Sequence, residues 1–129
     1  MPQQVARFWI PGPLPGMNDM TAKRGRGRGF AYAKAKEKWT NDIALLALAA
    51  HVPHFNRVHI SYRWVEPNKK RDPSNVAAGG RKVVEDGLVR AKVLENDGWK
   101  QMAGPGAGWS ADFEVGPRPG VEVTIEEVG

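Results

Sequence analysis

A strict alternation of apolar and polar side chains is the feature that most constrains how this chain can fold. In "RVHISYRW" (57–64) every second residue from Val58 to Trp64 is apolar, and "VEVTIEEV" (121–128) repeats the pattern. Successive side chains of a strand point to opposite faces, so both segments predict strands of a sheet with one buried face. Such a sheet needs other elements to cover its apolar side.

The segment 33–50 is the strongest candidate for that cover. It is rich in Ala, Leu and Lys and contains neither Pro nor Gly. Trp39, Ile43, Leu46 and Ala50 recur at steps of three and four residues, which is the spacing of one helix face. We therefore expect a helix whose apolar stripe packs in the core.

Two further strands complete the expected fold. "ARFWI" (6–10) is a short apolar run that ends at "PGPLPG", and part of "GWSADFEV" (108–115) follows a glycine-rich loop over 102–109. Together with a second helix after Asp72, the order becomes β-α-β-α-β-β. The sequence thus predicts an α/β (α+β) fold, with a small mixed β-sheet packed with two main helices.

Length and composition limit the organisation of the chain. Its 129 residues are the usual length of one domain, so we expect a single domain over 1–129. The absence of cysteine excludes disulfides and thiolate metal sites. No apolar run approaches the roughly 20 residues that span a bilayer. We expect a cytoplasmic protein without a membrane partner.

The charge of the chain indicates a polyanionic partner, because its net charge is +5 and its pI is near 9.7. Cations are concentrated in "KRGRGRG" (23–29) and "NKKR" (68–71). The first segment lies in a glycine-rich stretch, expected to be a mobile basic loop at about 18–30. Solvated loops without a partner are the alternative for either segment alone. The candidate phosphate contacts are Arg24, Arg26, Arg28, Lys69, Lys70 and Arg71.

The second helix is expected to begin at an Asp-Pro step. Asp72 is a good N-cap, Pro73 suits the first helical position, and Ser74 is an alternative cap. Gly79 and Gly80 are unfavourable inside a helix. Either the regular helix starts only near Arg81, or something approaches the helix backbone closely at the glycines.

Acidic residues and a lysine are distributed along this segment and beyond its end. Lys82 and Asp86 are four residues apart and would share one helix face, where an ordinary surface ion pair is the simplest interpretation. Asp97 follows the helix and could meet Asp72 if the chain doubles back. Carboxylates gathered in this way would suit Mg²⁺, which prefers oxygen ligands.

These features, in this order, resemble the RusA family of Holliday junction resolvases, which bacteria and their prophages encode. The family pattern is Asp-x-Asp-Asn, then a Lys, then Asp-Ala-Leu, then a pair of Asp residues. Here "DPSN" begins at Asp72, Lys82 precedes "DGL" at Asp86 by four residues, and "ND" ends at Asp97. The likeness extends to "FWIPGPLPGMND", "YAKAKEKWTNDIA" and "VEVTIEEVG", and so covers most of the chain.

The resemblance implies a Mg²⁺-dependent endonuclease, with Mn²⁺ as a possible substitute, that resolves four-way DNA junctions in recombination and repair. Its partners would be branched DNA and a second copy of the chain, because a two-fold dimer presents two equivalent sites for symmetric nicking. No small-molecule cofactor is implied. The implied catalytic residues are Asp72, Lys82, Asp86 and Asp97; the implied metal ligands are Asp72, Ser74, Asp86 and Asp97, supported by Asn75 and Asn96.

Two alternatives stay open. Ser74 and Asn96 stand where the family has acids, so a catalytically weakened or inactive protein that binds branched DNA without cutting it is the first alternative. An RNA-binding module, indicated only by "KRGRGRGF", is the second. Trp99 and Trp109 lie near the candidate site; we expect them to pack in the core, with stacking on an exposed base as the other interpretation.

Overall fold

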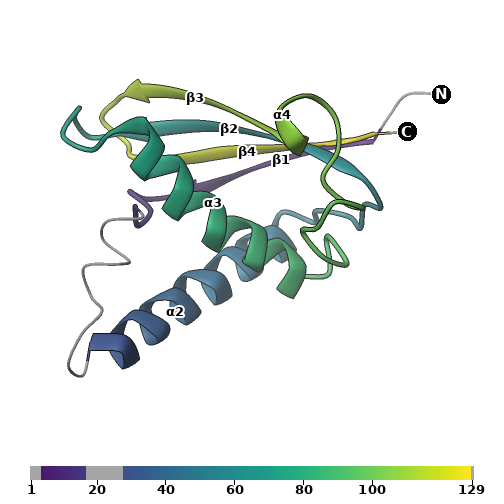
Figure 1. Ribbon diagram of the computed structural model, residues 1–129, viewed down its shortest axis with the longest axis horizontal. Coiled ribbons are helices and arrows are strands. Elements are labelled where there is room, and N and C mark those ends of the chain that lie inside the picture. The colour runs from purple at the N-terminus through teal and green to yellow at the C-terminus, as the bar shows by residue number, and fades with distance from the viewer. Residues whose placement is uncertain (1–3, 17–27, 129) are drawn as a thin grey trace.

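The computed structural model describes residues 4–16 and 28–128, which form one four-stranded sheet and its covering helices (Figure 1). The strands are β1 (Val5–Pro11), β2 (Val58–Glu66), β3 (Trp109–Val115) and β4 (Gly120–Glu127), and their order in the sheet is β1-β4-β2-β3. Strand β4 is antiparallel to both of its neighbours, whereas β2 and β3 are parallel. The predicted mixed sheet is confirmed.

The helices are α2 (Arg28–Ala49), α3 (Pro73–Arg90) and the short α4 (Pro105–Gly108), which lies within the glycine-rich loop before β3. Both long helices lie on one face of the sheet (Figure 1). The α+β class and the order β-α-β-α-β-β are therefore as the alternating segments predict.

The alternation in the strands corresponds to burial. In β2 the apolar residues from Val58 to Trp64 are buried, while Ser61 and Arg63 between them remain accessible to solvent. Val121, Val123 and Ile125 of β4 are buried in the same core. The sheet therefore buries its apolar face against the helices and leaves the opposite, polar face open.

Helix α2 is longer at its start, and shorter at its end, than the sequence predicts. Its residues Arg28 to Phe30 belong to the expected basic loop, so that the loop prediction is wrong over these three positions; residues 17–27 lie outside the described part of the chain. Ala50 lies beyond the helix and is exposed, which corrects its place in the apolar stripe.

The end of α2 has a clear physical cause. His51 adopts a left-handed backbone conformation with φ 56°, and the N–H of Val52 donates to the carbonyl of Ala47 at 3.1 Å. The N–H of His51 donates to the carbonyl of Leu48 at 3.0 Å. This Schellman arrangement satisfies the last carbonyls and stops the helix. The apolar periodicity of a sequence does not reveal such a stop.

Helix α3 runs without interruption through Gly79 and Gly80, which decides between the two interpretations of the glycine pair. A Cβ built at Gly80 would lie 2.3 Å from Cη2 of the buried Trp64. At Gly87, farther along α3, it would lie 2.6 Å from Cγ2 of Ile43 in α2. Glycine thus allows α3 to approach the sheet on one side and α2 on the other, and this close packing positions the candidate site.

Candidate functional site

The candidate residues fall into two groups, one at the start of α3 and the other near its end. Asp72 occupies the N-cap position, although its side chain makes no capping hydrogen bond. The 18 residues of α3 span about 27 Å at about 1.5 Å per residue, which separates Asp72 from Asp86 by about 21 Å. Mg²⁺ binds its ligands at about 2.1 Å, so one ion cannot bind both carboxylates of the same chain.

The expected convergence of Asp72, Asp86 and Asp97 is therefore not formed within one chain. The expectation failed because the helix is regular from Pro73 onward, and a regular helix holds its two ends apart. Within residues 4–16 and 28–128, no group of three or more His, Asp or Glu side chains is arranged to hold a metal ion. The roles of the individual residues stay predictions.

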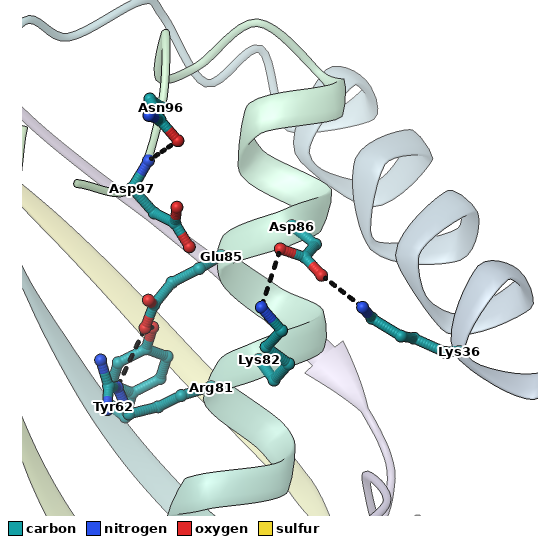
Figure 2. A network of polar contacts seen from close by, with 8 residues as sticks. All are labelled: Lys36, Tyr62, Arg81, Lys82, Glu85, Asp86, Asn96 and Asp97. Carbon is teal, nitrogen blue, oxygen red and sulfur yellow. Dashed lines mark hydrogen bonds and ion pairs between the residues drawn. The ribbon is translucent and has the colours of Figure 1, made fainter. Parts of the chain in front are cut away.

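Asp86, Asn96 and Asp97 are brought together around a hollow of about 540 Å³ between α2 and α3. Figure 2 shows the Asp97 side chain directed toward Glu85, whereas the Asp86 carboxylate lies on the α2 side of α3, between Lys36 and Lys82. Arg90 of α3 and Glu37 of α2 also line the hollow, and the guanidinium of Arg90 donates to Glu37 at 2.7 Å. Two of the three predicted aspartates thus line one hollow, together with the predicted supporting residue Asn96.

The chain doubles back after α3, as a site containing Asp97 requires. Lys92 adopts a left-handed conformation with φ 64°, and the N–H of Val93 donates to the carbonyl of Leu88 at 3.0 Å. Val93 and Leu94 are buried and hold the returning segment in the core. Oδ1 of Asn96 then accepts a hydrogen bond from the N–H of Asp97 at 2.8 Å, which fixes the backbone at the site.

Two lysines flank Asp86 (Figure 2). Nζ of Lys36 lies 3.3 Å from Oδ2 of Asp86, and Nζ of Lys82 lies 4.0 Å from Oδ1. The predicted pair of Lys82 and Asp86 is thus present, but the shorter contact comes from α2. Sequence reasoning missed Lys36, because only the packing of the two helices brings it to the site, and nothing in its local sequence marks it.

Glu85, which precedes Asp86 in α3, forms a second polar cluster with Arg81 of the same helix and Tyr62 of β2. The hydroxyl of Tyr62 donates to Oε2 of Glu85 at 3.0 Å, and Nε of Arg81 donates to the same oxygen at 2.9 Å. Burial raises the pKa of Glu85, and the charge of Asp97 adds to this rise, whereas Arg81 and Tyr62 oppose it. Burial also raises the pKa of Tyr62, with the negative charge of Glu85 as the next cause.

The raised pKa of Glu85 predicts a pH-dependent stability. The stabilisation linked to the protonated carboxyl is complete below the ordinary pKa of 4.5 and is lost as the pH rises through the folded-state pKa. Glu85→Gln cannot ionise, so we expect its free energy of unfolding to increase relative to the wild type between pH 4 and pH 8, as measured by urea unfolding. Glu95→Gln, at an exposed position, is the control. A difference that is constant with pH would contradict the prediction.

Near the start of α3, two predicted site residues, Arg71 and Asn75, contact other parts of the fold. Arg71 forms a bidentate ion pair with Glu66 at 2.8 and 2.9 Å and donates to the carbonyl of Leu14 at 2.8 Å. A Cβ at Gly16 would lie 2.7 Å from Nδ2 of Asn75. Arg71 and Asn75 therefore hold the segment after β1 against the start of α3. Neither contact involves the hollow that contains Asp86.

The remaining predicted residues near this end are exposed. Asp72, Ser74, Lys69 and Lys70 are all accessible to solvent, so the two lysines present their charges outward. Arg28 is the first residue of α2. Arg24 and Arg26 lie outside the described residues. Contacts of these cations with phosphates stay predictions.

The fold and the hollow together define a mixed α+β domain that presents carboxylates and lysines between two helices. No protein-family model matches the chain, and no curated protein matches it. In the described ranges, no helix has both the length and the apolar character needed to cross a membrane.

Proposed function

We propose that the protein is a Mg²⁺-dependent, structure-specific endodeoxyribonuclease that resolves four-way DNA junctions by paired nicking. The observation that carries the proposal is the hollow that gathers Asp86, Asn96 and Asp97 beside Lys36 and Lys82. Four of these five residues lie in the stretch from Asp72 to Asp97, which carries the pattern of acids and lysine that resembles the RusA family. The fifth, Lys36, adds a second cation to the same place.

The donor set in the hollow fits Mg²⁺, which proteins usually hold by one or two carboxylates together with water and phosphate oxygens. Asp86 and Asp97 would bind the ion, and Asn96 would support Asp97 through the hydrogen bond to its backbone. When bound, the ion supplies polarisation of the scissile phosphate and a water of lowered pKa. Mn²⁺ would substitute because it accepts the same oxygen ligands.

The two lysines have a distinct role in this proposal. In the absence of DNA, Lys36 and Lys82 balance the charge of Asp86. About half of the Lys82 side chain is accessible to solvent. Beside a phosphodiester, their positive charges would stabilise the negative charge that develops on the phosphate oxygens during hydrolysis. Asp86 would hold both ammonium groups in position for this task.

The charge distribution favours DNA binding on the helical side. The open face of the sheet carries Asp112 and Glu114 of β3, and Glu114 is paired with Arg63 at 2.6 Å. Glu122 and Glu126 of β4 share this face, which follows from the strand register. These four acids outnumber Arg7 and Arg63, the two arginines of the same face, and would repel phosphates.

The proposed homodimer is inferred from the symmetry of the reaction. Symmetric resolution requires one nick in each of two strands, and one chain offers one such hollow in its described part. A two-fold dimer would present two equivalent hollows to a junction with two-fold symmetry.

The test is cleavage of a synthetic four-way junction labelled on each strand. We expect paired nicks in Mg²⁺ or Mn²⁺, none in EDTA, and no cleavage of duplex DNA of the same sequence. Nicks that DNA ligase reseals would indicate 5′-phosphate and 3′-hydroxyl ends. Binding without cleavage in either metal would instead favour the alternative, a non-cutting protein, for which Ser74 and Asn96 in place of acids are the supporting observation.

Lys36→Met tests the lysine that the structure adds to the site. Loss of its charge beside Asp86 is expected to lower the rate of junction cleavage by about tenfold or more, because cations at a transferring phosphate stabilise the transition state. Lys38→Met is the matched control. Lys38 is on the same helix and pairs with Asp42 at 2.7 Å, away from the hollow. Equal rates for the two variants would exclude a role for Lys36 in cleavage.

A further inference from the structure

A second hollow, of about 380 Å³, lies next to the first and contains two tryptophans. Trp99 is 100% exposed, so its expected place in the core is wrong. Trp109 is half-buried, packs against the core, and carries the guanidinium of Arg81 at 3.9 Å from its ring centroid. The residues that line the hollow are Arg81, Glu85, Asp97, Gly98, Trp99, Met102 and Trp109.

The exposure of Trp99 follows from the turn that carries it. The N–H groups of Gln101 and Met102 both donate to the carbonyl of Gly98, at 3.1 and 3.0 Å. This turn is held on one side by the buried Leu94 and on the other by the buried Ala103. A large apolar ring at the tip of a well-held turn contributes nothing to the core, and its whole surface is accessible to a ligand in the adjoining hollow.

Asp97 connects this hollow with the first one, because its side chain lines both. A ligand that extends from one hollow to the other would place one part beside the tryptophans and another part beside Asp86 and the lysines. A nucleotide has this form, since an aromatic base is joined through a sugar to a phosphate. The face of the Trp109 ring next to Arg81 is occupied, which leaves Trp99 as the accessible platform.

We propose that this aromatic hollow binds one unpaired nucleobase of DNA by stacking on Trp99, while the adjoining phosphate lies at the Asp86–Asp97 hollow. The inference rests on the proposed function and adds the feature of the substrate that is recognised. A base within a duplex is stacked on both faces, so it offers no free face to Trp99. Bases at a branch point or in a single strand can offer one. The site would therefore favour branched over duplex DNA.

The test uses 2-aminopurine, a fluorescent adenine analogue whose emission falls when it stacks on an aromatic ring. It is placed at the branch of a four-way junction, in a single strand, and in the middle of a duplex, and all measurements are made in EDTA so that no strand is cut. We expect quenching by the wild type with the junction and the single strand, and little with the duplex. Trp99→Ala should abolish the quenching and weaken binding of both substrates about tenfold, as expected for loss of one stacking partner.

Two further variants make the result specific. Trp99→Phe keeps an aromatic face and should restore most of the affinity and the quenching. Trp9→Ala removes a tryptophan of β1 that is 38% exposed on the opposite face of the sheet, and it should behave as the wild type. Because Trp99 is fully exposed, its replacement does not disturb the core.

The possible results separate this inference from the proposed function. Junction cleavage in Mg²⁺ with no quenching, and equal affinity of Trp99→Ala and the wild type, would overturn the inference alone. Quenching that depends on Trp99, without cleavage in Mg²⁺ or Mn²⁺, would support the inference and overturn the nuclease. No binding of the junction or the single strand would overturn both.

Discussion

Asp97→Asn is expected to lower Mg²⁺-dependent cleavage of a four-way junction by about 100-fold or more. The substitution keeps the shape of the side chain but removes one of the three carboxylates that line the hollow between α2 and α3, of which Glu37 is already paired with Arg90. A metal ion at a phosphate contributes several kcal/mol to transition-state stabilisation, and about 1.4 kcal/mol corresponds to tenfold in rate. Single-turnover cleavage at saturating protein, titrated with Mg²⁺, measures the loss and shows whether more metal restores the rate.

Asp42→Asn is the matched control for this variant. Asp42 forms an ion pair with Lys38 four residues before it, as Asp86 does with Lys82, but it lies outside the hollow. Its replacement should leave cleavage unchanged, whereas Asp86→Asn should behave as Asp97→Asn does. If Asp97→Asn cleaves at the rate of the wild type, the hollow is not the catalytic site.

Asp72→Asn reports on the other end of α3. The resemblance implies that Asp72 is a ligand, yet the length of the helix places it about 21 Å from Asp86 of the same chain. If Asp72→Asn loses activity, mixing it with Asp97→Asn tests whether two subunits complete one site. Recovered cleavage in the mixture would mean that Asp72 comes from the second copy, and cleavage unaffected by Asp72→Asn would confine the site to the hollow.

Gly80→Ala is expected to have the largest effect on stability. The added methyl group would lie 2.3 Å from Cη2 of Trp64, whose ring is buried and stacked on Tyr62 at a centroid distance of 5.3 Å. Overpacking typically costs about 1–3 kcal/mol, against a gain of about 1 kcal/mol in helix propensity. The short contact is with a rigid ring, so we expect a net loss of about 2 kcal/mol and a fall in Tm of roughly 5–10 °C.

Gly98→Ala is the control, because a Cβ there would meet no atom closer than 3.7 Å. It should leave the free energy of unfolding nearly unchanged. The double variant Gly80→Ala with Trp64→Phe provides a further check, since a smaller ring should relieve part of the clash and give a favourable coupling energy in a double-mutant cycle. Additive effects of the two substitutions would mean that α3 shifts away from the sheet instead.

Much of the fold follows from local patterns. The alternation from Val58 to Trp64 depends only on the two-residue period of a strand, and it predicts both the strand and its buried face. The Asp-Pro step predicts the start of α3 at Pro73, because proline suits the first turn of a helix. The end of α2 before Ala50 could not be found in this way, since the turn at His51 leaves no apolar signal.

The candidate site was predictable only in part. The sequence by itself determined that Lys82 and Asp86 share a helix face and that Asp97 follows the helix, because spacing along a regular helix is a local property. Only the tertiary structure decided that α3 continues unbroken through Gly79 and Gly80 and so holds Asp72 far from Asp86. It alone also decided that Lys36 contacts Asp86 and that Trp99 is exposed. Such relations depend on how segments distant in the chain pack against each other, and the close approach of α3 to Trp64 and Ile43 at its glycines sets that packing.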